Sequence, residues 1–205
     1  MLLKKVTIHK YKSFLTEQTY EVESQITRIV GKNESGKTAL LEALAKSNYF
    51  EDNAEFKFSK DLDYPRGELT KVRNENPEAI TCEYELSDED IQKIEDDFES
   101  GIIQKQIFSV TSYYDNTRTT TGVSVDFSVF KDWLIKTFGV GDQGKEFINE
   151  ADSFSNLEDT VTENSTLPGM KEIKTELEKI KDASGGWKNS LEGYIYRTFI
   201  SPAIP

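Results

Sequence analysis

The chain begins with a pattern of alternating apolar and polar residues. Three segments have the short alternating or apolar runs that are typical of β-strands, at residues 3–11, 18–22 and 26–30. Val6 and Ile8 fall on one face of the first strand, so we expect that face to be buried. The third run ends directly at Gly31, and small and aliphatic residues from Ala39 onward favour a helix that ends near Ser47. The pattern therefore predicts a strand, a loop and a helix in succession around Gly31.

The rest of the chain mixes strand and helix patterns. The predicted elements are a strand at 80–86, a helix at 88–98 with Ser87 as its N-cap, a hairpin within 106–130, and helices at 130–138, 170–180 and 187–199. Residues 50–78 are expected to be irregular, because proline and glycine interrupt them. Residues 139–169 are expected to form a mobile loop, because they are rich in Gly, Ser, Thr, Asn and acids. This order of elements predicts an α/β fold.

The loop after the third strand fits the phosphate-binding pattern G-x-x-x-x-G-K-[ST] in full. In such a loop the glycines let backbone N–H groups surround phosphates, and the helix that follows points its positive end at the anion. Lys37 is expected to place a positive charge near the β- and γ-phosphates, and the Thr38 hydroxyl to ligate Mg²⁺. A chance turn is the alternative, which the strand before the loop and the helix after it disfavour. The sequence therefore predicts a P-loop NTPase that binds ATP and Mg²⁺ through Gly31, Lys32, Asn33, Glu34, Ser35, Gly36, Lys37 and Thr38.

The segment before the loop adds a resemblance to a known family. "IHKYKSF", a short strand pair and then "IVGKNESGKTALLEAL" resemble the N-terminus of ABC-type ATPases of the SMC and RecF kind. The chain looks closest to the OLD (overcoming lysogenization defect) family and its relatives in bacterial anti-phage systems. Their first strand ends in a motif like F-K/R-S-F, which Tyr11-Lys12-Ser13-Phe14 matches. The resemblance implies that Lys12 and Ser13 lie near the nucleotide phosphates, although Lys12 alone reads as a solvated residue at a strand end.

The resemblance covers residues 1–50 well and the remainder diffusely. It implies an ABC-type ATPase lobe with a mixed core sheet, an antiparallel β-subdomain and inserted helices. Residues 1–205 are then a single partial domain, with a P-loop core at 1–50, a β-rich variable part at 51–130 and a helical part at 131–205. The chain stops on an apolar segment, which is typical either of a piece of an ATPase head or of a natural short form, and the sequence leaves both open.

The resemblance also implies partners. ABC-type ATPase heads of this kind dimerise on nucleotide, so a second head is the expected partner. The remainder of the ATPase, a Toprim-type nuclease or another effector is expected to receive the signal, with DNA among the candidate ligands. A DNA-directed or anti-phage defence role therefore follows from the resemblance alone.

Two further parts of such an ATPase are not recognisable in the sequence. No hydrophobic run ends in the Asp-Glu pair that would hold Mg²⁺ and activate water, and the nearest, Val123–Asp126, is predicted to be a half-exposed strand. "ASGGWK" at 183–188 has the letters of a signature motif, but no Asp-Glu strand follows it, so a helix end and a turn are favoured. Hydrolysis by this chain alone is therefore expected to be weak or absent, and no residue is assigned a catalytic role.

Acidic clusters raise the question of a Toprim-like metal site within the chain. The candidates by composition are Asp61, Asp63, Asp88, Asp90, Asp96 and Asp97. Helix capping explains Asp88 to Asp90 and a solvated face explains Asp96 and Asp97, so acidic residues alone do not define a site here. His9, the single histidine, is expected to be a surface strand residue.

Composition narrows the class of protein further. The net charge of −12 argues against a broad DNA grip by this chain alone, although residues 1–60 hold ten basic against eight acidic residues. The single Cys82 cannot form an internal disulfide, and no apolar run approaches the roughly 18 residues of a membrane span. A cytoplasmic protein with no membrane partner is therefore expected. A non-catalytic nucleotide-binding module stays open as an alternative, as does a small P-loop kinase, for which the scattered arginines show no lid-like cluster.

Overall fold

The structure, a computed structural model, describes residues 1–33, 35–49 and 54–204. They form two compact units, and each is described by itself. Unit 1 consists of Met1–Glu85 and Ile107–Gly122, and unit 2 of Leu86–Gln106 and Val123–Ile204. The predicted division into parts at residues 50 and 130 stays a prediction. No helix in the described ranges is long and apolar enough to cross a membrane.

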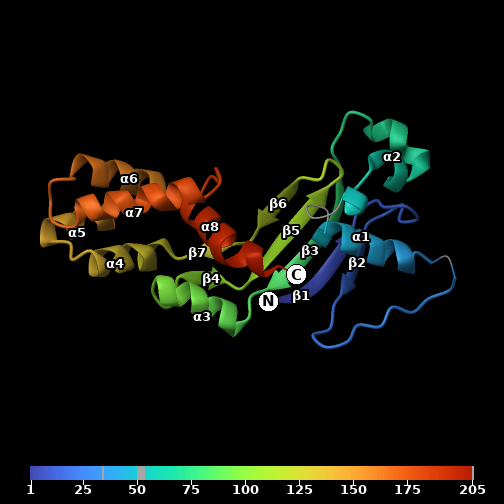
Figure 1. The fold of residues 1–205 in the computed structure, drawn as a ribbon, viewed down its shortest axis with the longest axis horizontal. Helices are drawn as coiled ribbons and strands as arrows, with labels where there is room; N and C mark the ends of the chain where they lie inside the picture. Colours follow the sequence, from blue (N-terminus) through green and yellow to red (C-terminus); the bar gives the residue numbers. More distant parts are fainter. Residues whose placement is uncertain (34, 50–53, 205) are drawn as a thin grey trace. The chain divides into compact units, whose positions relative to one another are not determined.

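Unit 1 is built on a five-stranded sheet in the order β2-β1-β3-β5-β6, in which every pair is antiparallel (Figure 1). Its strands are β1 (Leu2–Ile8), β2 (Gln18–Glu21), β3 (Glu78–Glu85), β5 (Ile107–Tyr113) and β6 (Arg118–Thr121). Val6 lies opposite Cys82, which lies opposite Val110, and all three are buried. The alternation seen in the sequence thus produces one continuous apolar face.

Helix α1 (Lys37–Tyr49) lies against this sheet and contacts β3. Ala39, Leu40 and Ala43 form its buried stripe, and Ser47 Oγ lies 3.8 Å from Cys82 Sγ. The helix predicted from Ala39 onward is therefore confirmed and begins two residues earlier, directly after Gly36. The α/β class is confirmed as well.

The predicted strand at 26–30 does not form. The segment is an irregular part of the long loop between β2 and α1, and Ile26 and Val30 are 71% and 88% exposed (Figure 1). A strand needs a neighbour that satisfies its main-chain N–H and C=O groups. Among the described residues, β2 pairs with β1 alone, and no strand pairs with 26–30.

The stretch that was expected to be irregular contains short helical turns. They are η1 (Ala54–Phe56), α2 (Lys60–Asp63) and η2 (Arg66–Val72). Lys60 Nζ donates to the main-chain carbonyl oxygens of Val72, Arg73 and Glu75 at 3.2, 3.1 and 2.7 Å. One lysine thereby ties α2 to the end of η2, a long-range contact that no local sequence pattern reports.

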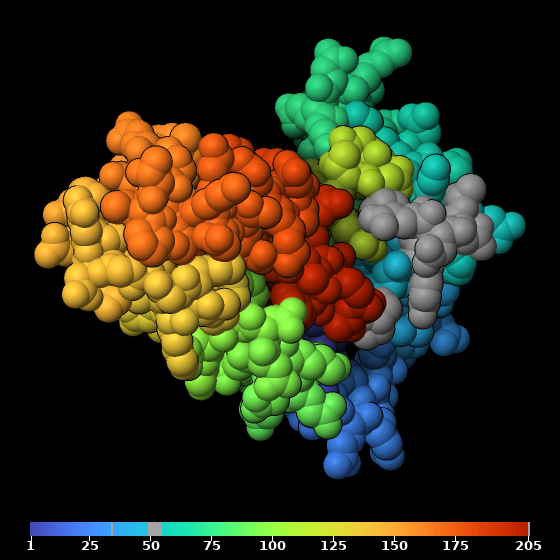
Figure 2. Space-filling view, turned by 60° about the vertical axis from the view of Figure 1, so that its left-hand side comes forward, coloured from blue at the N-terminus to red at the C-terminus, as the bar shows by residue number. Residues whose placement is uncertain are grey.

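Unit 2 is mainly helical. It contains the strand pair β4 (Ile103–Lys105) and β7 (Ser124–Val125) and the helices α3 (Asp88–Asp97), α4 (Phe127–Thr137), α5 (Asp142–Glu150), α6 (Phe154–Glu163), α7 (Met170–Ala183) and α8 (Ser190–Ile195), followed by η3 (Tyr196–Ile200) and η4 (Ser201–Ala203). Ser87 is the N-cap of α3, as predicted, and the structure adds a capping box with Asp90. Helices α6 and α7 contact one another and lie side by side in the orange region of Figures 1 and 2.

The expectation of a loop over residues 139–169 is wrong, because α5 and α6 occupy most of that segment. The segment is mostly polar, but it contains a few apolar residues at helical spacing. Phe154, Leu157 and Val161 are all buried, and they recur every three or four residues along α6. Ser153 accepts a hydrogen bond from the Asn156 N–H and begins that helix.

Candidate functional site

A pocket of about 510 Å³ opens in unit 1 at the N-terminal end of α1. Its described lining consists of Lys12, Ser13, Asn33, Ser35, Gly36, Lys37, Thr38, Ala39 and Glu42. The fold therefore brings the turn after β1 and the loop before α1 to one place. Glu34, which the sequence also assigns to the loop, lies outside the described residues.

Lys37 is the first residue of α1, and its side chain contacts the main chain of the loop. Its ammonium group donates to the carbonyl oxygens of Gly31 at 2.9 Å and Lys32 at 2.7 Å. Neither of those two residues lines the pocket, and the loop curves around the lysine side chain. The Ser35 N–H donates to the Lys32 carbonyl oxygen at 3.3 Å and closes the curve.

Gly36 lies where the loop approaches the turn after β1. Its φ is +89°, which favours glycine, and a Cβ at this position would meet Phe14 Cζ at 3.0 Å and Ser13 Oγ at 3.2 Å. The Gly36 carbonyl oxygen accepts the first helical hydrogen bond, from the Leu40 N–H at 2.9 Å. The second glycine of the motif is therefore needed both for its backbone conformation and for the close packing.

The turn after β1 holds Lys12 and Ser13 at the rim of the pocket. Tyr11 and Phe14 exchange two main-chain hydrogen bonds, and Lys12 between them has a φ of +49°. This left-handed conformation is costly for a residue with a side chain, by about 1–2 kcal/mol. The Lys12 N–H donates to the Asp63 carbonyl oxygen at 2.6 Å, which holds the turn in place from α2.

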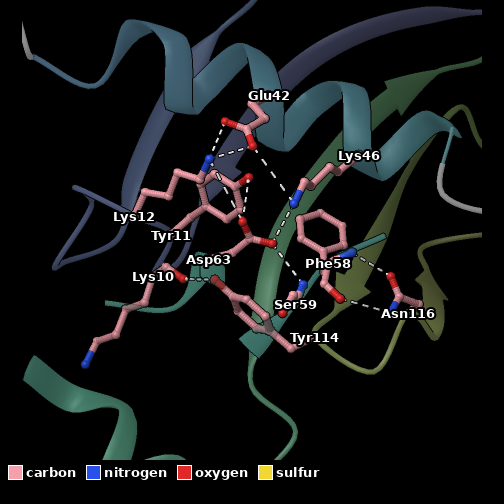
Figure 3. Close-up of polar contacts among 10 residues, drawn as sticks. All are labelled: Lys10, Tyr11, Lys12, Glu42, Lys46, Phe58, Ser59, Asp63, Tyr114 and Asn116. Carbon is pink, nitrogen blue, oxygen red and sulfur yellow. Dashed lines mark hydrogen bonds and ion pairs between the residues drawn. The ribbon is translucent and has the colours of Figure 1, made fainter. Parts of the chain in front are cut away.

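Four side chains of alternating charge lie next to one another in unit 1 (Figure 3), the first two on the pocket lining and the last two buried. We call Lys12, Glu42, Lys46 and Asp63 the charge row. Lys12 Nζ donates to both carboxylate oxygens of Glu42, and Lys46 Nζ lies 2.6 Å from Asp63 Oδ2 and 3.9 Å from Glu42 Oε1. The exposed fraction falls along the row, from 36% and 34% for the Lys12 and Glu42 side chains to 10% and 3% for those of Lys46 and Asp63.

The inner end of the charge row is held by hydrogen bonds from neighbouring groups. The Ser59 N–H donates to Asp63 Oδ2 at 2.8 Å, and the buried Tyr11 hydroxyl donates to Asp63 Oδ1 at 3.4 Å. Burial, and after it the charge of Asp63, raises the pKa of the Tyr11 hydroxyl, which therefore remains a neutral donor. Asp63 is thus paired on both oxygens.

Further contacts in Figure 3 fix the segments around the row. The Tyr114 hydroxyl donates to the Lys10 carbonyl oxygen at 2.5 Å, just before the Lys12 turn. Asn116 Oδ1 accepts from the Phe58 N–H at 2.7 Å, and Asn116 Nδ2 donates to the Phe58 carbonyl oxygen at 3.1 Å. The β5–β6 turn thereby supports both the Lys12 turn and the start of α2.

Sequence reasoning missed the roles of Glu42, Lys46 and Asp63. Glu42 and Lys46 are four residues apart on α1, a spacing that places them on one helix face and was the available signal. Asp63 was a candidate metal ligand, whereas the structure pairs it with Lys46. Asp90 belongs to the capping box of α3, and the described part of the chain contains no group of three or more potential metal-ligating side chains.

The two weak motif candidates both lie in unit 2. Asp126 caps α4 by accepting hydrogen bonds from the N–H groups of Ser128 and Val129, at 2.9 and 3.3 Å, so it is a capping residue. In "ASGGWK", Ser184 is buried and its hydroxyl donates back to the Lys181 carbonyl oxygen at 2.7 Å. Gly185 and Gly186 have positive φ angles, which fits a helix end followed by a turn.

The side chain of His9 contacts three other side chains. His9 Nδ1 lies 3.0 Å from Glu17 Oε2, and its Nε2 lies 2.9 Å from Thr81 Oγ1 and 3.3 Å from Glu78 Oε2. These contacts join β1 to the neighbouring strand β3 and to the segment before β2. His9 does not line the pocket at the N-terminus of α1.

The family comparison agrees with the loop motif. A family model described as the AAA ATPase domain matches residues 1–201, whereas no curated protein matches. One similar solved structure, from "Structural biochemistry of ATP-driven dimerization and DNA stimulated activation of SMC ATPases", has 14% identity and a TM-score of 0.38, and the match covers 87% of this chain and 99% of that chain. Another, "Crystal structure of the SmcHead bound to the C-winged helix domain of ScpA", has 15% identity and a TM-score of 0.38, with 90% and 57% covered.

The family match covers nearly the whole chain, including the pocket in unit 1 and all the helices α1 to α8. The predicted P-loop NTPase fold is therefore confirmed. The chain belongs to the AAA ATPase domain family, and this membership implies that it binds a nucleotide.

Proposed function

We propose that the pocket at the N-terminus of α1 binds ATP with Mg²⁺. The observation that carries the proposal is the convergence of the Lys12 turn and the loop before α1 on one pocket, with two lysine side chains among its lining residues. A triphosphate is a large anion, and lysine ammonium groups together with main-chain N–H groups at a helix N-terminus are the donors that bind it.

The residues present fit such a ligand. Lys37 would neutralise phosphate charge, and the N–H groups of the first turn of α1 would donate to phosphate oxygens. Thr38 is exposed and lines the pocket, so its hydroxyl is available to hold Mg²⁺. Bound Mg²⁺ would supply further neutralisation of the phosphates. Lys12 provides a second cation from outside the loop.

We further propose that the chain is the nucleotide-binding part of an ABC-type ATPase of the OLD and SMC-like class. The support is the Tyr11-Lys12-Ser13-Phe14 motif, of which Lys12 and Ser13 line the pocket together with residues of the loop. On this proposal, nucleotide gates dimerisation with a second head, and dimerisation is coupled to a DNA-directed or anti-phage defence effector. This chain alone hydrolyses ATP weakly or not at all, because its sequence lacks an Asp-Glu strand.

Isothermal titration of Mg·ATP into the wild-type chain and into Lys37→Ala tests the binding proposal. Loss of one charged hydrogen-bond donor removes about 1.5–3 kcal/mol, so the affinity should fall by roughly 10- to 100-fold. Lys71→Ala is the matched control, because Lys71 is an exposed lysine of unit 1 that does not line the pocket. Absence of binding to the wild type, or equal binding by Lys37→Ala, would contradict the proposal.

Phosphate release and light scattering test the second proposal. We expect slow release by the wild-type chain and a larger mass of the particle in Mg·ATP than without nucleotide. Fast turnover that is lost in Lys37→Ala would refute the prediction of near-inactivity. A mass that does not change with nucleotide would refute gated dimerisation by this chain.

A further inference from the structure

Glu42 places a negative charge on the lining of a pocket that is otherwise suited to anions. Of the described lining residues it is the only acid, and it faces Lys12, one of the two basic ones. Both carboxylate oxygens accept from Lys12 Nζ, so the ammonium group that could bind a phosphate is already neutralised. We propose that Glu42 restrains Lys12 and thereby lowers the affinity of the pocket for ATP, an inference that rests on the proposed function.

The pair has the properties of an interaction that can be exchanged. The Lys12 and Glu42 side chains are 36% and 34% exposed, and pairs of that exposure contribute about 0–1 kcal/mol, so phosphate can displace the carboxylate. A triphosphate carries several negative charges and competes well for one ammonium group.

The main chain of the Lys12 turn is held in place, so the Lys12 side chain can move without it. The Lys12 N–H is held by the Asp63 carbonyl oxygen at 2.6 Å, and the turn is closed by the two hydrogen bonds between Tyr11 and Phe14. The flexible four-carbon stem of lysine can then carry the charge from Glu42 to a phosphate without any change in the fold.

The charge row also provides a second cation for Glu42 after the exchange. Lys46 Nζ lies 3.9 Å from Glu42 Oε1, one helical turn further along α1. Release of Lys12 therefore does not leave the carboxylate isolated. Glu42 acts as a positioning residue for Lys12, and it opposes binding through this pairing.

A double-mutant cycle on Mg·ATP affinity tests the proposal, using the wild type, Glu42→Gln, Lys12→Ala and the double variant. Glu42→Gln should bind Mg·ATP about three- to five-fold more tightly, the effect of an interaction of this exposure. In the Lys12→Ala background the same substitution should change affinity by less than about two-fold, because its partner is absent. A gain in affinity is a result that mere loss of structure cannot produce.

Glu85→Gln is the matched control. Glu85 pairs with Lys4 at 3.0 Å, with side chains 31% and 41% exposed, and lies outside the pocket lining. It changes the net charge equally, so we expect its affinity for Mg·ATP to equal that of the wild type. Equal tightening in Glu85→Gln would assign the effect to overall charge and overturn the proposal.

The outcomes separate this inference from the proposed function. If the wild type binds Mg·ATP and Lys37→Ala binds it more weakly, but Glu42→Gln binds no more tightly than the wild type, the inference is wrong and the proposed function stands. Equal tightening with and without Lys12 would also overturn it, because Glu42 would then act without Lys12. If the wild type fails to bind, the proposed function itself is wrong. Thermal unfolding without nucleotide confirms that each variant is folded.

Discussion

The two ends of the charge row contain the same chemistry in different surroundings. Lys46 and Asp63 are almost fully buried and 2.6 Å apart, whereas Lys12 and Glu42 are about one-third exposed and line the pocket. Breaking a buried pair by removing one partner costs about 3–5 kcal/mol, whereas an exposed pair contributes about 0–1 kcal/mol. Since both pairs join a lysine to a carboxylate, their burial decides which pair stabilises the fold and which can exchange partners.

Asp63→Ala should have the largest effect on stability. It removes the carboxylate nearest to the buried Lys46 ammonium, which lies beside two aromatic rings and keeps only Glu42 at 3.9 Å, so the free energy of unfolding should fall by about 3–5 kcal/mol. Urea unfolding followed by circular dichroism measures this change.

Asp61→Ala is the control for that experiment, because Asp61 is exposed on the same short helix. An exposed substitution of this kind should change the free energy of unfolding by less than about 0.5 kcal/mol. If Asp63→Ala were as mild as Asp61→Ala, the buried pair would not be a stabilising feature, and the contrast between the two ends would fail.

Gly36→Ala disturbs the pocket end without changing any charge. The added Cβ would meet Phe14 Cζ at 3.0 Å, and the φ of +89° is strained for alanine, so stability should fall by about 1–2 kcal/mol and Mg·ATP binding should weaken. The control is Gly67→Ala, since a Cβ on Gly67 would have no atom within 4 Å. Calorimetry on both variants that gave equal unfolding temperatures would contradict the packing described for Gly36.

Glu42→Gln should have the smallest effect on stability. Because the pair is partly exposed and Lys46 keeps Asp63, the free energy of unfolding should change by less than about 1 kcal/mol. The same urea experiment provides the test. A loss as large as that of Asp63→Ala would mean that the pocket end also holds the fold.

Local patterns were enough to predict much of unit 1. The strand around Val6 and Ile8, the hairpin within 106–130 and the helix after Gly36 all follow from apolar periodicity and turn residues. The placement of Lys12 beside the loop came from a family resemblance rather than from any local pattern. The turn that contains Lys12 packs against Gly36 through Ser13 and Phe14, a contact between residues far apart in the sequence.

The features that the sequence did not predict correctly each have a physical reason. The apolar run Ile26–Val30 has strand character, but no described strand pairs with it, and pairing is a property of the whole sheet. Residues 139–169 fold because a few apolar side chains, such as Leu157, recur at helical spacing among many polar ones. The pairing of Lys46 with Asp63 joins α1 to α2, and neither residue's neighbours in the sequence indicate it.

A crystal structure with Mg²⁺ and a non-hydrolysable ATP analogue tests the central claim most directly, because it locates both the ligand and Lys12. The account predicts the triphosphate in the pocket at the N-terminus of α1, with Lys37 Nζ and Lys12 Nζ within hydrogen-bond distance of phosphate oxygens and Thr38 on the metal. Nucleotide bound elsewhere on the chain, or bound in the pocket with Lys12 still on Glu42, would contradict it.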